Sequence, residues 1–299
     1  MPFPVIDAHQ HVWDPARARY DWLRSDPLLD RAIGFDEVVP ELRVCGVDAT
    51  VLVQSADEAA DTALMRETAE RHMEVAAIVG FAPLDDPEET ARTVEAWSAD
   101  PLMVGVRALI HDRADPDWIL QPVVRESLSV IESAGLSFDL VAVLPRHLEH
   151  VPTLSERHPD LRIVIDHLAK PPIGRGDSGV WRDGIARAAG NPLVSAKVSG
   201  LYSATSDPSA WTGELIAPFF DHAVHVFGAD RLMYGGDWPI SLHAGGYRRV
   251  WEGLHALIET LSPDERERVR GRTAARVYRI DAAHLDARAA ARLDGDRTP

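Results

Sequence analysis

The chain has 299 residues, of which 45% are hydrophobic and 26% charged, and its formal net charge is -16 at pH 7. These values are typical of a globular protein, and the acidic balance argues against nucleic acid and anionic membranes as partners. No apolar stretch is long enough to cross a bilayer, no signal-peptide pattern follows Met1, and a single cysteine excludes an internal disulfide. We therefore expect a cytoplasmic protein.

The first informative segment is Val5 to His11, an apolar run that ends in two histidines. If it is a strand, its side chains alternate, and Asp7, His9 and His11 share one face. A His-x-His pair is common in surface loops, but polar groups on a buried strand are costly unless they bind something. The irregular, aromatic stretch that follows, at 13–34, is typical of a lid or pocket wall.

From residue 35 onward, segments with helical and strand periodicity alternate without a break in composition. After the first strand, we expect strands at 49–54, 75–81, 102–107, 136–141, 161–167, 194–199 and 231–237. We expect helices at 35–44, 57–72, 88–97, 122–134, 148–158, 181–189, 214–227, 241–261 and 263–278. Continuously apolar strands indicate a parallel sheet buried on both faces. Eight such pairs predict a single (β/α)8 TIM barrel domain over 1–280, with a tail at 281–299 that is helical or frayed.

Active sites of such barrels lie at the carboxyl ends of the strands, where this sequence places many polar residues. Each has an ordinary structural explanation when taken alone. Together they would destabilise a buried barrel unless they bind one another, a substrate or a metal. The candidates at the strand ends are His9, His11, Gln54, Arg107, Asp139, His167, Lys197, Ser199 and Asp237.

The strongest subset of these candidates is His9, His11, His167 and Asp237. Three neutral imidazoles and one carboxylate suit at most one divalent ion, with Zn²⁺ favoured and one position open for water. In the metal-free alternative, the histidines donate hydrogen bonds to a carbonyl while Asp237 activates water as a general base. No glycine-rich phosphate-binding motif is present, so we expect no nucleotide or organic cofactor.

Two loops add further candidates for binding the substrate. Lys170 follows the strand that ends at His167, although an ordinary loop lysine explains it equally well, and Tyr202 follows the strand that ends at Ser199. Ser199 lacks the Gly-x-Ser-x-Gly elbow of a hydrolase nucleophile. The residues expected to bind the substrate are Gln54, Arg107, Asp139, Lys170, Lys197, Ser199, Tyr202, Trp13, Trp22 and Trp238.

Four motifs in this order resemble the amidohydrolase superfamily: Asp7-Ala8-His9-Gln10-His11, Asp166-His167-Leu168-Ala169-Lys170-Pro171, Lys197-Val198-Ser199-Gly200-Leu201 and Tyr234-Gly235-Gly236-Asp237-Trp238-Pro239. From Pro4 to about Ile280 the chain is similar to the amidohydrolase-2 branch. That branch contains sugar lactonases of the L-fuconolactonase and L-rhamnonolactonase types and 2-pyrone-4,6-dicarboxylate hydrolases. The resemblance implies a (β/α)8 fold and hydrolysis of a cyclic ester, with the two N-terminal histidines, His167 and Asp237 at the catalytic positions. Arg107 stands where a carbamylated lysine would be, and Lys197 where a further histidine would be, which argues against a binuclear metal centre.

These features predict an enzyme that opens a small lactone, above all a sugar-acid lactone, by attack of water on the ring carbonyl with Asp237 as general base. Two alternatives within the superfamily stay open. One is hydrolysis of a carboxylated lactone, such as a muconolactone or pyrone, and the other is metal-dependent decarboxylation. A non-catalytic binding barrel is disfavoured because it would not need the whole set of interior polar residues.

Overall fold

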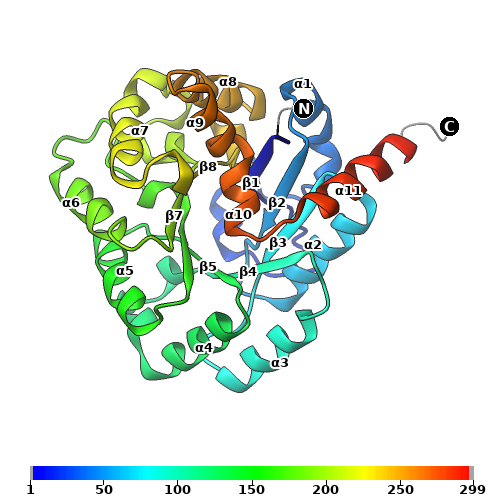
Figure 1. Ribbon diagram of the computed structural model, residues 1–299, viewed down its shortest axis with the longest axis vertical. Helices are drawn as coiled ribbons and strands as arrows, with labels where there is room; N and C mark the ends of the chain where they lie inside the picture. The colour runs from blue at the N-terminus through cyan, green and yellow to red at the C-terminus, as the bar shows by residue number, and fades with distance from the viewer. Residues whose placement is uncertain (1–2, 296–299) are drawn as a thin grey trace.

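Eight parallel strands form a barrel with helices around it (Figure 1) in the computed structural model, which describes residues 3–295. The strands are β1 (Ile6–Gln10), β2 (Ala49–Val53), β3 (Val75–Gly80), β4 (Met103–Ala108), β5 (Ser137–Leu140), β6 (Arg162–Ile165), β7 (Val194–Val198) and β8 (Leu232–Tyr234). Strands that are consecutive in sequence are neighbours in the sheet. The ring closes beyond β8, where His11 N donates to Trp238 O and Asp237 N donates to His9 O. The predicted (β/α)8 barrel is confirmed.

One or more helices follow each strand. They are α1 (Val39–Cys45), α2 (Ala59–Arg71), α3 (Pro87–Trp97), α4 (Pro122–Ser133), α5 (Pro145–Arg157), α6 (Gly179–Ala188), α7 (Gly213–Phe227), α8 (Tyr247–Ile258), α9 (Pro263–Glu267), α10 (Thr273–Val277) and α11 (Ala282–Gly295). Prolines in the first turn begin several of them, because proline has no N–H to leave unpaired there. Within residues 3–295, no helix is both long and apolar enough to cross a membrane.

Four predicted helices differ from those observed. The segment expected as a helix at 35–44 begins as a 3-10 turn at Phe35–Glu37, and α1 begins only at Val39. The helix expected at 148–158 begins earlier, at Pro145. The helix expected at 241–261 begins only at Tyr247, because Gly245 and Gly246 adopt φ of 93° and 98° and separate it from a short 3-10 turn. The helix expected at 263–278 is divided into α9 and α10 by a π-helical segment at Arg268–Arg272.

The C-terminal tail forms α11, which projects at one side of the barrel (Figure 1). The Arg288 guanidinium donates to Ala69 O, His72 O and Met73 O at the C-terminal end of α2, where backbone carbonyls have no partner within the helix. The tail is therefore attached to the barrel by a helix cap. Positions 296–299 of the predicted tail lie outside the described residues.

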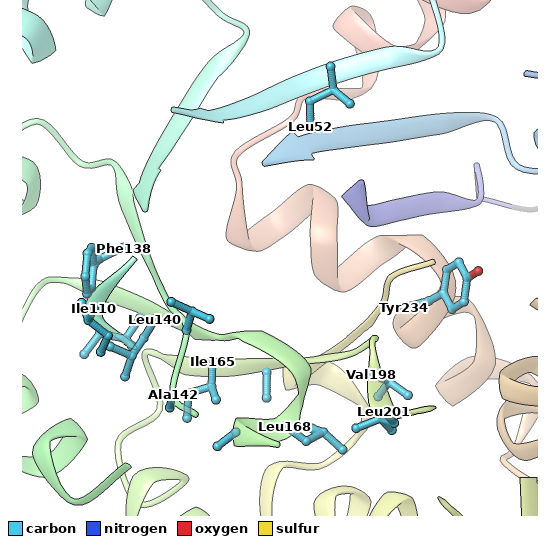
Figure 2. Close-up of a cluster of buried hydrophobic side chains, with 14 of the residues drawn as sticks. Leu52, Ile110, Phe138, Leu140, Ala142, Ile165, Leu168, Val198, Leu201 and Tyr234 are labelled. Carbon is cyan, nitrogen blue, oxygen red and sulfur yellow. The ribbon is translucent and has the colours of Figure 1, made fainter. Parts of the chain in front are cut away.

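The hydrophobic core has two layers. Inside the barrel, apolar residues such as Ile6, Ala8, Val51 and Val164 pack together. A larger layer fills the space between strands and helices, and Figure 2 shows part of it, including Phe138, Leu140, Ile165 and Val198. Each fully buried Val, Leu, Ile or Phe stabilises the fold by about 1.5–3 kcal/mol. The outer layer holds the strands so that their carboxyl ends meet in a fixed arrangement.

A β-bulge in β1 changes which of its side chains face the interior. Asp7 pairs with Thr50 but Gln10 pairs with Leu52, so β1 has one extra residue over this stretch. Asp7 instead accepts hydrogen bonds from Gly236 N and Tyr247 OH, which attaches β1 to the segment after β8 and to α8. The expectation that Asp7 shares a face with His9 and His11 is wrong, because the extra residue shifts the alternation.

Candidate active site

Four polar side chains meet at the carboxyl end of the barrel. His9 Nε2 lies 3.1 Å from His11 Nε2 and 3.7 Å from Asp237 Oδ1, and His11 Nε2 lies 3.5 Å from the same oxygen. The His167 ring centroid is 4.6 Å from that of His9. His9, His167 and Asp237 each offer one possible metal-ligating atom, and these atoms lie within 4.8 Å of one another. Residues far apart in the sequence thus form one cluster.

Two segments of unusual backbone position His167 and Asp237. His167, Leu168, Ala169 and Lys170 form a left-handed turn with φ between 49° and 58°, and Asp237 has φ of 53°. Such conformations cost on the order of 1–3 kcal/mol each in L-residues and persist where the surroundings impose them. Gly200 lies between the two segments, and a Cβ there would be 2.5 Å from both Asp237 Oδ2 and His167 Nδ1. This close approach requires glycine at position 200.

Hydrogen bonds orient the rings and the carboxylate. His11 Nδ1 donates to Val53 O at 2.7 Å, which holds the ring with its Nε2 facing His9 and Asp237. His167 Nδ1 lies 2.9 Å from Ser199 Oγ. Asp237 directs Oδ1 toward the histidines, while its Oδ2 accepts from Tyr202 OH at 3.1 Å. His11, His167 and Asp237 are therefore each held from a second side.

The protonation states in the cluster follow from burial and from neighbouring charges. Burial alone would raise the pKa of Asp237, but His167, His11 and Lys170 lower the pKa to about 2. Burial also holds the pKa values of His9 and His167 well below the usual value for histidine. At neutral pH the cluster therefore contains an ionised Asp237 carboxylate beside the neutral imidazoles of His9 and His167.

A buried ion-pair network contacts His9 from within the barrel. Lys197 Nζ lies 2.6 Å from Asp139 Oδ2 and 3.1 Å from Asp166 Oδ1, and Arg107 Nη1 lies 2.8 Å from Asp166 Oδ2. His9 Nδ1 is 3.0 Å from Lys197 Nζ and 3.2 Å from Asp166 Oδ1. These charged side chains are at most 6% exposed. Two cations balance two carboxylates, which avoids a net buried charge.

Asp166 and Tyr278 belong to this network but were not among the residues expected from the sequence. Asp166 continues the inward alternation of Val164 in β6, so strand periodicity could have identified it. His167, the next residue, then also points toward the cluster only because the left-handed turn begins there. Tyr278 donates to Asp139 Oδ2 from beyond α10, and no sequence pattern indicates that contact.

A cavity of about 700 Å³ opens above the cluster. Six of the expected site residues line it: His11, Trp22, Arg107, His167, Lys170 and Asp237. Eight do not: His9, Trp13, Gln54, Asp139, Lys197, Ser199, Tyr202 and Trp238.

The residues outside the cavity contact other parts of the protein. Gln54 donates to Arg107 O, Ser199 contacts His167, and Trp13 donates to Leu29 O and Arg31 O within its own loop. Asp139 and Lys197 form the buried network described above. Two polar atoms of this group, Trp238 Nε1 and Gln54 Oε1, have no hydrogen-bond partner within residues 3–295. Contact of these eight residues with the substrate stays a prediction.

Several residues that line the cavity do not lie at the ends of strands, so the strand pattern of the sequence does not identify them. Burial lowers the pKa of one of them, His111, to about 4. They come from loops and from the first turns of helices, whose orientation strand periodicity does not determine. The set includes Ser55, Leu109, His111, Leu148, Trp181, Ser203 and Ile240.

The fold and the polar cluster at the carboxyl end of the strands define an enzyme of the (β/α)8-barrel class. The chain belongs to the amidohydrolase family, whose model matches residues 6–280. It is 37% identical over 282 residues to an L-fucono-1,5-lactonase of Burkholderia ambifaria, across 92% of this chain and 96% of the relative. It is 30% identical over 290 residues to an L-fucono-1,5-lactonase of Burkholderia multivorans, again across 92% and 96%.

Solved structures agree with this assignment. An amidohydrolase from Burkholderia multivorans, described with bound zinc, matches with a TM-score of 0.86 at 29% identity, over 93% of this chain and 100% of that one. A probable 2-pyrone-4,6-dicarboxylic acid hydrolase from Acinetobacter baumannii matches with a TM-score of 0.73 at 17% identity, over 92% and 99%. The second match supports the fold alone.

Proposed function

We propose that this protein hydrolyses the lactone of a sugar acid, with Asp237 as the general base for the attacking water. The observation that carries the proposal is the ionised Asp237 carboxylate, which lies beside three imidazoles and lines the cavity. The two relatives named L-fucono-1,5-lactonase support a sugar-acid lactone as the substrate.

In the proposed reaction, the lactone carbonyl lies against the imidazoles and water lies beside Asp237. Asp237 takes a proton from water as the water oxygen bonds to the carbonyl carbon. The bond from that carbon to the ring oxygen then breaks, and the alkoxide receives the proton from Asp237. The pKa of about 2 makes Asp237 a weak base but a strong acid once protonated, which favours the second step. The product acid releases its own proton to solvent.

The donor set fits a single divalent ion, with Zn²⁺ favoured. In a tetrahedral zinc site with bonds of about 2.0–2.2 Å, ligand atoms are separated by about 3.3–3.6 Å. The three separations among His9 Nε2, His11 Nε2 and Asp237 Oδ1 are 3.1, 3.7 and 3.5 Å. These residues and His167 would hold the ion. When bound, it would polarise the carbonyl and lower the pKa of water.

The His9 tautomer decides whether the site can accept a metal. When Nδ1 accepts from Lys197, Nε2–H donates to His11 Nε2, and the rings satisfy each other without an ion. When Nδ1–H donates to Asp166, the lone pair of Nε2 becomes available to an ion. Arg107 Nη1 lies 3.3 Å from the same Nε2 and disfavours a dication there. We infer that any ion is weakly held and that the protein groups suffice for turnover.

Complete removal of metal should therefore lower kcat by less than about tenfold, because Asp237 and the imidazole donors stay in place. Metal analysis before and after dialysis against a chelator, combined with initial rates, checks this. A loss of more than 100-fold that added Zn²⁺ restores would show that the ion is essential and that the inference from the His9 tautomers is wrong.

A carboxylated lactone is the second candidate substrate. Arg107 and Lys170 both line the cavity, and the buried Arg107 Nε has no hydrogen-bond partner within residues 3–295. A substrate carboxylate could supply that partner.

A lactone panel distinguishes the two substrates. Acid release from L-fucono-1,5-lactone, muconolactone and 2-pyrone-4,6-dicarboxylate is followed with a pH indicator. We expect the highest kcat/KM for the sugar lactone. A higher value for either carboxylated lactone would transfer the assignment to the second candidate, and release of CO2 without ring opening would contradict hydrolysis.

A further inference from the structure

One arm of the cavity has a largely apolar wall that a sugar ring does not require. It lies between the segments that follow β5 and β6, and we define this apolar arm by Val141, Val143, Leu148, Val180, Trp181 and Gly184. A cavity of about 700 Å³ matches the size that holds a drug-sized ligand, which exceeds a single sugar lactone. Space therefore remains beyond the reacting centre.

Polar side chains lie at the two ends of the arm. In these two segments, His167 and Lys170 line the reacting end of the cavity. The same two segments contribute four other charged residues to the cavity lining. All four are exposed and form its rim: Glu149, Arg175, Asp177 and Arg187. A hydroxyl bound between these ends would lose its hydrogen bonds to water without replacement, whereas an apolar group would not.

The walls of the arm are packed to keep this apolar surface. Trp181 Nε1 donates to Leu168 O at 2.7 Å, so its one polar atom is satisfied and the ring contributes apolar surface. A Cβ on Gly184 would lie 2.8 Å from Leu148 Cδ2, so glycine allows α5 and α6 to approach closely. At the outer end of the arm, Val143 and Val180 are 38% and 64% exposed, and they extend the apolar surface to the rim.

We propose that the apolar arm binds an alkyl or aryl substituent of the lactone ring, so that the enzyme also opens lactones with apolar side chains. This inference rests on the proposed function, because the same Asp237 opens the ring. The left-handed turn at 167–170 connects the reacting cluster with the apolar arm. His167 belongs to the cluster, and Leu168 O accepts the hydrogen bond from Trp181 in the arm.

The first test compares δ-valerolactone, δ-octalactone and δ-dodecalactone. Each methylene buried in the arm should raise kcat/KM about 3- to 5-fold, until the arm is filled. Val180→Asp should lower the ratio of kcat/KM for δ-dodecalactone to that for δ-valerolactone at least tenfold. The matched control is Val44→Asp, at a position on α1 that is 65% exposed and does not line the cavity, and it should leave the ratio unchanged. A flat dependence on chain length, or equal effects of the two variants, would overturn the proposal.

The second test does not depend on turnover. Calorimetric titration of the wild-type protein with 5-hydroxypentanoate and 5-hydroxydodecanoate measures the affinities of two product acids. Their ratio reports how strongly the arm binds the longer alkyl chain. We expect the longer acid to bind at least tenfold more tightly, and Val180→Asp to reduce this preference. If no lactone is hydrolysed but the preference is observed, the proposed function fails, and of the present proposal only the binding of an apolar group in the arm stands. Equal affinities would reject the arm even if sugar lactones are hydrolysed.

Discussion

Replacing Asp237 with asparagine should lower kcat for lactone hydrolysis by about 1,000-fold while the protein stays folded. Asparagine has the same shape but cannot accept the proton from water, and general-base catalysis contributes about 100- to 10,000-fold. Asparagine also tolerates the left-handed backbone that Asp237 adopts, at φ of 53°. Initial rates, together with thermal unfolding of the variant, check both parts of this expectation.

Asp85→Asn is a matched control for this experiment. It removes the same charge from an exposed aspartate that does not line the cavity, so both kcat and the unfolding temperature should stay near wild-type values. If Asp237→Asn retained kcat within tenfold of wild type, Asp237 would not be the base. An equal loss in both variants would attribute the effect to net charge.

Replacing Lys197 with methionine should lower the free energy of unfolding by about 3–5 kcal/mol, because it leaves buried carboxylates without their shared partner. Lys197 contacts Asp139, Asp166 and His9, and it is fully buried. Burial already raises the pKa of Asp139, so in the variant this carboxyl should take up a proton at low pH. The loss of stability should therefore be smaller at pH 5 than at pH 8, and urea unfolding at both values measures it.

The double variant Lys197→Met with Asp139→Leu separates charge balance from packing. It removes one cation and one carboxylate and leaves Arg107 paired with Asp166, so it should recover much of the lost stability. Tyr278 loses its acceptor in this variant, which limits the recovery. A single variant as stable as wild type, or a double variant less stable than the single one, would contradict the charge-balance explanation.

The barrel and the central cluster could be predicted because both depend on simple periodic rules. Apolar strands alternating with amphipathic helices specify a parallel barrel, and the polar residue at the end of each strand then belongs to one face. This reasoning placed His9, His11, His167 and Asp237 at the same end of the barrel, where they lie close together. The orientation of His167 and Asp237 depends in addition on their left-handed backbone.

Departures from regular strand geometry were not predictable in the same way. The bulge in β1 turns Asp7 toward α8, and the left-handed turn after β6 directs His167 to the site beside Asp166. Neither feature has a glycine or proline signature within the segment itself. Both depend on contacts with distant residues, such as Gly200 against His167.

The walls of the cavity were the least predictable part of the site. Leu148 and Trp181 lie on helices, where the sequence shows only that they are apolar and does not distinguish a core position from a cavity wall. Trp13 shows the opposite error. An aromatic residue in a loop near the site is expected to line the cavity, but the Trp13 side chain is 1% exposed and packs in the core of its own loop. Exposure to the cavity is a property of the assembled barrel.

Hydrolysis of L-fucono-1,5-lactone in ¹⁸O-labelled water, followed by mass spectrometry of the product acid, tests the central claim most directly. Attack of water on the ring carbonyl predicts enzyme-dependent ring opening that places one labelled oxygen in the carboxylate and none in the hydroxyl. Label in the hydroxyl, or a rate no higher than that of the Asp237→Asn protein, would contradict the proposed reaction.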